Sequence, residues 1–337
     1  MAVERQKAAE QDKLARRSNF EAVESNFTKE QMKLEASRCL NCKNPRCVQG
    51  CPVNIQIPSF IQALKEDNLE KAGEIIRQTS MLPSVCGRVC PQERQCEGNC
   101  ILGIKGESVS IGALERYVGD NTKAQMPKIT PSGKKVAIVG SGCAGITAAA
   151  DLRKTGHEVV VFEALHKLGG VLRYGIPPFR LPRKFLDREI DALKAMGVEF
   201  HTNVIVGKSI TLKQLKEDGF DAIFICSGAG LPKMMNIPGE NLNGVFSANE
   251  FLTRVNLMGA GREEDCVTPL RIGKKVAVIG GGNVAMDAAR TAVRVGFEEV
   301  SILYRRTEKE LPARLEEIRH AKEEGVQFKF LHAPVEI

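Results

Sequence analysis

The pattern of apolar and polar positions divides the chain into two parts of different character. In the N-terminal part, apolar residues recur at helical intervals within a charged segment, at Phe20, Val23 and Phe27. We expect a helix there, with most of its surface in solvent. Two more short helices are predicted at 58–64 and 69–76, with turn residues after the second. The N-terminal part is therefore predicted to consist mainly of helix and loop.

The second part begins after a stretch at 121–135 that contains Pro127, Pro131 and Gly133 and predicts a linker. Beyond it, short continuous apolar runs alternate with helical patterns. Fully apolar strands separated by helices are typical of parallel βα units, whose strands are buried on both faces. The chain is therefore predicted to be helical first and then α/β.

The first βα unit contains a glycine-rich motif. An apolar strand at 135–139 leads into Gly140, Gly142 and Gly145, and an alanine-rich helix follows at 146–154. In a dinucleotide-binding turn, the first glycine permits the tight turn, the second lets a pyrophosphate approach the backbone, and the third allows the helix to pack closely on the strand. The N-terminus of the helix then faces the phosphates.

An acidic residue follows the next strand of the same unit. The predicted strand at 158–162 ends at Glu163, which is placed to accept hydrogen bonds from the hydroxyls of an adenosine ribose. Glycines also mark ordinary turns, but here strand, glycines, helix and acid come in the order that nucleotide binding requires. A ribose with a free 2′-hydroxyl implies FAD or NAD.

The order of strand, glycine turn, helix and strand recurs later in the chain, but the last strand ends at basic residues. An apolar strand at 275–279, a glycine turn at 280–285 and a helix are followed by a strand at 300–304 that ends at Arg305 and Arg306. A guanidinium at this position can pair with the 2′-phosphate that distinguishes NADP from NAD. The alternative is an exposed basic turn with no ligand.

Cysteines supply the third candidate chemistry. Eight of the eleven lie in two tight runs ahead of both glycine motifs. The runs are Cys39, Cys42, Cys47 and Cys51, followed by Pro52, and Cys86, Cys90, Cys96 and Cys100. Intervals of a few residues and a Cys-Pro pair allow several thiolates to surround one inorganic cluster. Iron-sulfur clusters fit these runs best, and together with two nucleotide motifs they indicate electron transfer.

Two other interpretations of the cysteine runs are less well supported, and a third applies to isolated cysteines. Structural zinc sites are usually built from two C-x2-C pairs, and only Cys39 and Cys42 have that spacing. A disulfide framework is typical of small secreted chains, whereas this chain is long and starts with charged residues. Isolated free thiols explain Cys226 and Cys266, which we expect to be buried.

Composition excludes several classes of protein. The 337 residues, 43% of them hydrophobic and 26% charged, are enough for two to three globular domains. No apolar run approaches the roughly 20 residues that span a bilayer, so no membrane role is predicted. The net charge of +7 comes from dispersed basic residues, and there is no tryptophan, so nucleic acid is not an expected partner. A cytoplasmic protein is expected.

Several longer motifs resemble those of a known family over nearly the whole chain. They are Leu82 to Pro91 around Cys86 and Cys90, Ser110 to Tyr117, Gly175 to Leu181, and the turn at 280–285. The sequence resembles the small subunit of bacterial NADPH-dependent glutamate synthase and its relatives. These include the large subunit of the electron-bifurcating NADH-dependent ferredoxin:NADP oxidoreductase, the sulfide dehydrogenase flavoprotein and the N-terminal half of dihydropyrimidine dehydrogenase.

The resemblance implies two [4Fe-4S] clusters held by interleaved ligands. One cluster would use Cys39, Cys42, Cys47 and Cys100, and the other Cys51, Cys90, Cys96 and the side chain of Glu115. Read without the resemblance, Glu115 would be an ordinary helix-surface glutamate. Cys86 is the remaining thiol of the two runs and competes with Glu115 for the last position.

The resemblance also assigns the nucleotides: FAD to the first motif and NADPH to the second. The implied FAD residues are Gly140, Gly142, Ala144, Gly145, Glu163, Gly169, Gly170, Gly175, Ile176 and Arg180, and the implied NADPH residues are Gly280, Gly282, Asn283, Val284, Ala285, Arg305 and Arg306. Tyr174 to Pro177 and Arg180 would approach the isoalloxazine ring, where a cation favours the reduced anionic flavin. The alternative is a surface loop stiffened by proline.

The predicted architecture is a helical domain with two [4Fe-4S] clusters at 1–130, an FAD-binding Rossmann-like domain at 131–240 and an NADPH-binding Rossmann-like domain at 241–337. Two departures from the family are expected to matter. Cys143 stands where the family usually has proline. Family members also continue well beyond Ile337, so we expect a C-terminally truncated chain whose flavin site lacks one wall and whose sheet has an open edge.

The implied activity is that of an NADPH-dependent oxidoreductase without a protein acid, base or nucleophile. NADPH would pass a hydride to FAD, and electrons would then reach a partner subunit singly through the two clusters. The implied partner is the large subunit of glutamate synthase. One alternative is the electron-bifurcating transhydrogenase, whose partner is a small flavoprotein subunit, and another is a non-catalytic docking or assembly module.

Overall fold

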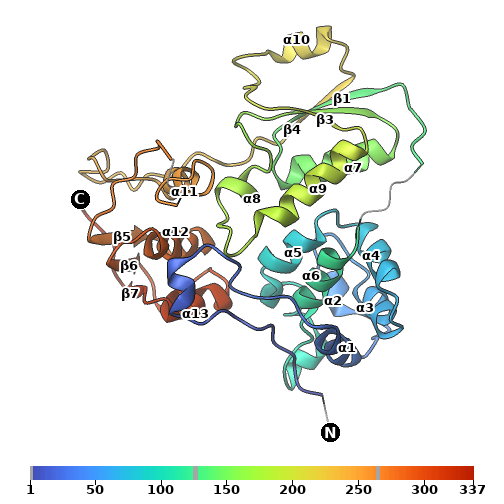
Figure 1. Cartoon of the computed structure of the whole chain (residues 1–337), viewed down its shortest axis with the longest axis horizontal. Coiled ribbons are helices and arrows are strands. Elements are labelled where there is room, and N and C mark those ends of the chain that lie inside the picture. The colour runs from blue at the N-terminus through green and yellow to red at the C-terminus, as the bar shows by residue number, and fades with distance from the viewer. Residues whose placement is uncertain (1–2, 124–127, 263–265) are drawn as a thin grey trace. The chain divides into compact units, whose positions relative to one another are not determined.

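The computed structural model describes residues 3–123, 128–262 and 266–337, which form two compact units (Figure 1). The first unit comprises Met1–Glu10, Glu24–His166 and Arg183–Cys226. The second comprises Gln11–Val23, Lys167–Pro182 and Ser227–Ile337. The segments Gln11–Val23 and Lys167–Pro182 thus pack in the second unit although their flanking residues belong to the first.

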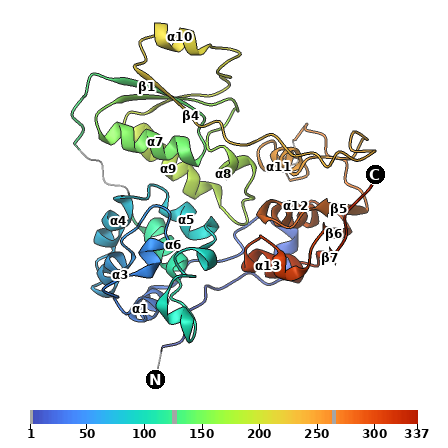
Figure 2. The same ribbon diagram turned by 180° about the vertical axis from the view of Figure 1, so that it is seen from behind.

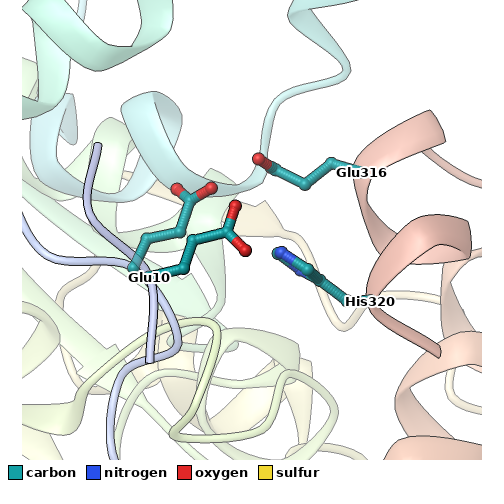
Figure 3. A group of neighbouring side chains, drawn as sticks. Glu10, Glu316 and His320 are labelled. Atoms are coloured by element: carbon teal, nitrogen blue, oxygen red, sulfur yellow. The ribbon is translucent and has the colours of Figure 1, made fainter. Parts of the chain in front are cut away.

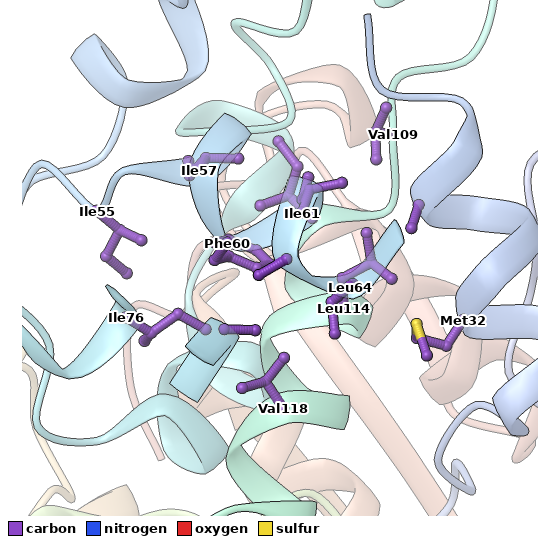
Figure 4. Packing of buried hydrophobic residues seen from close by; sticks show 14 of the residues in the cluster. Met32, Ile55, Ile57, Phe60, Ile61, Leu64, Ile76, Val109, Leu114 and Val118 are labelled. Atoms are coloured by element: carbon purple, nitrogen blue, oxygen red, sulfur yellow. The ribbon is translucent and has the colours of Figure 1, made fainter. Parts of the chain in front are cut away.

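The N-terminal part of the first unit is helical, as the sequence predicts. Its helices are α1 (Lys29–Ser37), α2 (Arg46–Gln49), α3 (Ile57–Lys65), α4 (Leu69–Arg77), α5 (Pro83–Val89), η2 (Gln92–Arg94), η3 (Ile101–Ile104) and α6 (Ile111–Asn121). Apolar side chains of α3 and α6, among them Phe60, Ile61, Leu64, Leu114 and Val118, form the core of this part (Figure 4). The predicted helices at 58–64 and 69–76 are confirmed as α3 and α4.

The helix predicted around Phe20, Val23 and Phe27 is wrong. This stretch is extended, and Glu24 forms an isolated antiparallel bridge with Glu10. The side chain of Asn26 accepts the N–H of Phe27 at 3.0 Å, a local hydrogen bond that competes with helix formation. Val23 and Phe27 are 3% and 5% exposed, so the expectation of a solvated surface fails for them as well.

The C-terminal part of the first unit is a parallel sheet with the order β3-β2-β1-β4. Its elements are β1 (Lys135–Val139), α7 (Cys143–Lys154), β2 (Glu158–Phe162), α9 (Arg183–Ala195), β3 (Glu199–His201), α10 (Leu212–Glu217) and β4 (Ala222–Ile225). Helices α7 and α9 lie on the same side of this sheet in both views (Figures 1 and 2). The side chain of Leu215, from α10, joins the core with Val160 and Phe162.

The second unit contains a smaller parallel sheet with the order β5-β6-β7. Its elements are η1 (Ala15–Ser18), α8 (Val171–Tyr174), α11 (Ala248–Asn256), β5 (Lys275–Ile279), α12 (Asn283–Arg294), β6 (Glu299–Tyr304), η4 (Glu308–Glu310), α13 (Leu315–Glu323) and β7 (Gln327–Phe330). Apolar residues of α12 and α13, such as Met286 and Ile318, share a core with Val300 and Ile302 of β6. Parallel strands joined by helices are the predicted Rossmann-like arrangement.

Two further expectations concern the chain as a whole. Residues 124–127 of the predicted linker lie outside the described residues, and 128–134 contain no helix or strand. Within the described ranges, no helix is long and apolar enough to cross a membrane.

Candidate functional site

Four predicted cluster ligands line one cavity in the helical part of the first unit. Cys39 follows α1, Cys42 lies in the next turn, Cys47 belongs to α2, and Cys100 precedes η3. The cavity has an apolar wall formed by Ile57, Ile61, Val109 and Ile111. Residues from both cysteine runs therefore meet at one site, as the interleaved ligand assignment requires.

Burial and neighbouring cysteines disfavour the ionised form of the thiols in this cavity. Burial raises the pKa of the Cys39 thiol, and Cys42 and Cys100 raise it further. Burial likewise raises the pKa of Cys47 to about 11, with Cys100 and Cys39 contributing. Grouped thiolates repel one another, so simultaneous deprotonation needs a compensating positive charge. Iron bound by thiolates supplies that charge, and the donor set fits a [4Fe-4S] cluster.

Members of the second predicted ligand set are electrostatic neighbours, because Cys96 interacts with both Cys51 and Glu115. Burial holds the pKa of Cys96 well above its usual range, and the charges of Glu97, Glu115 and Cys51 add to this effect. Glu115 is itself only 5% exposed, and its Oε1 atom has no hydrogen-bond partner. Burial and the neighbouring Cys86 raise the pKa of this carboxyl well above its usual range. A buried carboxylate oxygen without a partner is costly unless it binds something, so Glu115 fits a ligand role.

Cys86 lies at the same site and remains a competitor. A hydrogen bond to Cys90 and burial raise the pKa of Cys86 well above its usual range. The hydroxyl of Ser80 lies 3.9 Å from the Cys86 sulfur. Both Cys86 and Glu115 therefore adjoin the other members of the second set, and the choice between them stays a prediction.

The first glycine loop connects β1 to α7 and has the geometry of a phosphate site. Gly140 has φ 111°, a conformation that residues with a side chain rarely adopt. A Cβ atom on Gly145 would lie 2.0 Å from the Gly140 carbonyl oxygen, so close packing requires glycine there. A Cβ on Gly142 would meet nothing within 4 Å, which leaves open space in front of the helix N-terminus.

The Glu163 carboxylate stabilises this loop through hydrogen bonds, a role that the sequence did not predict. The carboxylate is 6% exposed and accepts hydrogen bonds from the backbone N–H and the hydroxyl of Ser141. It also accepts the N–H of Leu165 at 2.9 Å. The sequence placed an acid after β2, but only the fold shows that Glu163 lies against Ser141 of the loop.

The second glycine loop connects β5 to α12 in the same way. Gly280 has φ 133°, and a Cβ on Gly282 would again meet nothing within 4 Å. The Asn283 side-chain oxygen accepts the backbone N–H of Arg314 at 2.9 Å, which fixes the loop to the start of α13. Arg305 and Arg306 follow β6 and are exposed, so their guanidinium groups are accessible to a phosphate.

The remaining predicted flavin residues belong to the second unit. Gly169 and Gly170 have positive φ values of 118° and 51° and precede α8, while Gly175 and Ile176 follow it. Arg180 is not a free cation: its Nη1 atom lies 2.7 Å from Asp287 Oδ2, and its Nε atom lies 2.8 Å from Glu317 Oε1. Burial alone would lower the pKa of Arg180, but Asp287 and Glu317 raise it above its usual value.

Arg180 belongs to a larger buried network in the second unit that the sequence did not reveal. Its members are Arg16, Arg180, Asp287, Arg290, Arg294, Glu317, Glu323 and Glu324. Burial raises the pKa of Glu324, but hydrogen bonds from Arg294 and Arg290 have the larger, opposite effect and lower this pKa to about 2.

Two neighbouring side chains of α13 are not among these members. Figure 3 shows Glu316 and His320, which project from α13 one helical turn apart.

Two protein families match this chain, one over its helical part and one over the rest. The family described as dihydropyrimidine dehydrogenase domain II, 4Fe-4S cluster, matches residues 16–127. The pyridine nucleotide-disulphide oxidoreductase family matches residues 134–337. The small chain of NADPH glutamate synthase from Escherichia coli is 39% identical over 329 residues, which cover 96% of this chain and 70% of that protein. The chain belongs to the glutamate synthase small chain family.

Two other relatives extend this picture. The beta subunit of an NADPH-Fe(3+) oxidoreductase from Geobacter sulfurreducens is 40% identical over 300 residues, which cover 86% of this chain and 43% of that protein. Among solved structures, a 2-naphthoyl-CoA reductase complex superposes with a TM-score of 0.54 at 19% identity, over 85% of this chain and 39% of that one, and shows similarity of fold alone.

Family membership confirms several predictions from the sequence. The helical iron-sulfur region followed by Rossmann-like units is confirmed, as is the class of NADPH-dependent iron-sulfur flavoprotein oxidoreductase. FAD, NADPH and [4Fe-4S] clusters are the cofactors of this class. The domain bounds and the individual ligand assignments stay predictions.

Proposed function

We propose that the chain is the electron-input subunit of a multi-subunit enzyme of the glutamate synthase type, supplied by NADPH. The observation that carries the proposal is the convergence of Cys39, Cys42, Cys47 and Cys100 on one cavity, in a chain that also forms two nucleotide loops. This combination suits electron transfer better than hydrolysis or group transfer, because it brings together redox cofactors without a catalytic acid, base or nucleophile.

The residues divide between the cofactors as follows. The four cavity cysteines would hold one [4Fe-4S] cluster, and Cys51, Cys90, Cys96 and Glu115 the other. The loop at 140–145, Glu163 and the segment at 169–180 are assigned to FAD, and the loop at 280–285 with Arg305 and Arg306 to NADPH. When bound, the flavin would accept hydride from NADPH and the clusters would carry single electrons.

A rigid joint inside the first unit supports this division of roles. Arg188 of α9 donates to the Ser84 hydroxyl at 2.6 Å and to the Gly119 carbonyl at 2.6 Å, so α9 of the FAD region binds both α5 and α6. Of the second ligand set, Glu115 lies on α6 and Cys90 directly follows α5. The hydrogen bonds of Arg188 therefore attach the helices that position these two residues to the FAD region of the same unit.

The first ligand set offers a surface for a partner subunit. Leu40 and Ile101, which adjoin Cys39 and Cys100 and line their cavity, are 61% and 47% exposed. Exposed apolar side chains that gather in one patch are typical of an interaction surface. The relatives from Escherichia coli and Geobacter sulfurreducens are named as a small chain and a beta subunit, which supports a larger partner. We place this complex in the cytoplasm.

The experiment that tests the proposal is a reductase assay under anaerobic conditions. Purified protein should reduce an artificial acceptor such as ferricyanide with NADPH, and much more slowly with NADH. Co-expression with a candidate glutamate synthase large subunit should yield a stable complex. Bound clusters and nucleotides without any acceptor reduction would instead support a docking or assembly module.

A further inference from the structure

The buried ionic network of the second unit lies outside both glycine loops, and Arg180 is its only member in a segment assigned above to a cofactor. At its centre, the guanidinium of Arg180 contacts carboxylates of two helices, Asp287 on α12 and Glu317 on α13. All three side chains are at most 5% exposed. Arg290 also pairs with Glu317 and is fully buried.

Stability alone is a weak reason for such an arrangement. Burying each charge costs several kcal/mol, and a well-packed apolar replacement of a buried ion pair is often neutral or stabilising. Asp287 Oδ1 has no hydrogen-bond partner, and burial raises the pKa of this carboxyl to about 6. A planar guanidinium instead provides directional hydrogen bonds. Because two of its nitrogen atoms contact two separate carboxylates, the Arg180 side chain is held in one position.

Arg180 fixes one end of the segment assigned to the flavin. Other residues of this segment also contact helices of the second unit: the Tyr174 carbonyl oxygen accepts the side-chain N–H of Asn256 at 3.1 Å. The Phe179 ring lies 4.7 Å from the Arg290 guanidinium and 3.9 Å from that of Arg294. Residues on both sides of Gly175 and Ile176 are therefore attached to helices of the second unit.

Asp287 lies on the helix that starts at the second glycine loop. Helix α12 begins at Asn283, directly after Gly282. Asp287 is four residues further on, which at 1.5 Å per residue is about 6 Å along the helix axis. The Arg180–Asp287 pair thus connects the loop assigned to NADPH with the segment assigned to FAD through one turn of helix.

We propose that Arg180 is a positioning residue that, through Asp287 and Glu317, makes the segment at 169–176 and helix α12 move as one body. The inference rests on the proposed function, since it concerns where NADPH and the flavin ring are held. Its consequence is that occupancy of the second loop is transmitted to the flavin segment. Hydride transfer depends steeply on such geometry, because a misplacement of about 1 Å can cost on the order of 100-fold in rate.

Hydrogen exchange of the 337-residue chain, as purified, tests this without measuring activity. The amides of Leu172, Tyr174 and Gly175 are hydrogen-bonded within the segment and report its opening. In the unaltered protein, NADP+ should slow exchange at 280–285 and also at 171–176, the latter by a factor in the roughly 5- to 150-fold range of ordinary coupling energies. Arg180→Lys keeps the charge but not the two-carboxylate geometry, and should abolish only the effect at 171–176.

Glu324→Gln is the matched control. Glu324 is as deeply buried and pairs with Arg290 and Arg294, but it does not contact Arg180. This variant should keep the NADP+ effect at 171–176, whatever it does to overall stability. Protection at 171–176 that persists in Arg180→Lys, or that disappears equally in Glu324→Gln, overturns the proposal.

A kinetic measurement separates positioning from binding. In rapid mixing with NADPH, Arg180→Lys should slow flavin reduction on the order of 100-fold at saturating NADPH, with the concentration for half-saturation unchanged. A normal rate, or a change confined to half-saturation, contradicts a positioning role. Absence of NADP+ protection at 280–285 in the unaltered protein would instead refute the proposed nucleotide site.

Discussion

Substituting one glycine of each loop with alanine, which adds a single carbon atom, tests which nucleotide each loop binds. Gly142 and Gly282 occupy equivalent positions before α7 and α12, and a Cβ atom on either would meet nothing within 4 Å. Their backbone angles, φ −70° with ψ −173° and φ −86° with ψ 177°, are accessible to alanine. Gly142→Ala and Gly282→Ala should therefore fold normally and fill only the space in front of each helix N-terminus.

The expected effects on stability and on binding differ in size. Alanine at a compatible position gains roughly 0.4–1 kcal/mol by restricting the unfolded chain, and loses about as much as a poorer N-cap residue. The net change in unfolding free energy should thus stay below about 1 kcal/mol. A displaced pyrophosphate loses one or more hydrogen bonds to a charged group, each about 1.5–3 kcal/mol, which corresponds to a roughly 10- to 100-fold weaker affinity.

Gly145→Ala supplies the contrast. Its Cβ would lie 2.0 Å from the Gly140 carbonyl oxygen and 3.1 Å from the Cys226 sulfur, so backbone must shift. Overpacking of this kind costs about 1–3 kcal/mol or more. This variant should lose thermal stability together with nucleotide affinity, unlike Gly142→Ala.

The assay combines FAD content after purification, calorimetric titration with NADP+ and thermal unfolding. Gly142→Ala should lose FAD and keep NADP+ affinity, and Gly282→Ala should do the reverse, with both melting temperatures near that of the unaltered protein. The reasoning is refuted by the opposite pattern, or by variants that bind both nucleotides normally.

Three further predictions follow from single sites. Glu115→Gln should lower the iron content from about eight to about four atoms per chain, as loss of one four-iron cluster requires. The control variant Cys86→Ser should keep the full iron content. Loss of iron in Cys86→Ser but not in Glu115→Gln would make Cys86 the ligand. Replacing Arg305 and Arg306 by glutamine should weaken NADPH binding by about 1.5–3 kcal/mol for each lost charged contact and leave NADH kinetics unaltered. Glu324→Ala removes the partner of buried arginines and should lower the free energy of unfolding in urea by about 3–5 kcal/mol. Because the pKa of Glu324 is lowered from 4.5 to about 2, its contribution in the unaltered protein is complete above pH 4.5 and disappears as the pH falls through about 2, which denaturation at a series of pH values checks.

Three strands of the nucleotide units, at 135–139, 158–162 and 275–279, could be predicted to the residue. Continuous apolar runs such as 135–139 and 275–279 are bounded by charged residues on one side and by glycine on the other. Neighbouring residues in the sequence therefore indicate where these strands begin and end. The cavity at Cys39, Cys42, Cys47 and Cys100 could also be anticipated, although grouping Cys100 with the first run depended on the family resemblance.

Other features depend on residues that are distant in the sequence. The spacing of Phe20, Val23 and Phe27 suggested a helix, but these residues lie in an extended segment. Over so short a stretch, the spacing of apolar residues does not distinguish a helix from an extended chain. Arg180 was expected beside the flavin ring on the family resemblance, and nothing in the sequence indicates that Asp287, more than a hundred residues later, lies 2.7 Å from it. Long-range ion pairs have no local signal.

The most direct test of the account is the cofactor content of anaerobically purified protein, followed by its visible spectrum as NADPH is added. About eight irons with acid-labile sulfide, as two four-iron clusters require, bound FAD, and bleaching by NADPH much more than by NADH are the expected results. Zinc in place of iron, or a spectrum that NADPH leaves unchanged while FAD is bound, would contradict an NADPH-dependent iron-sulfur flavoprotein.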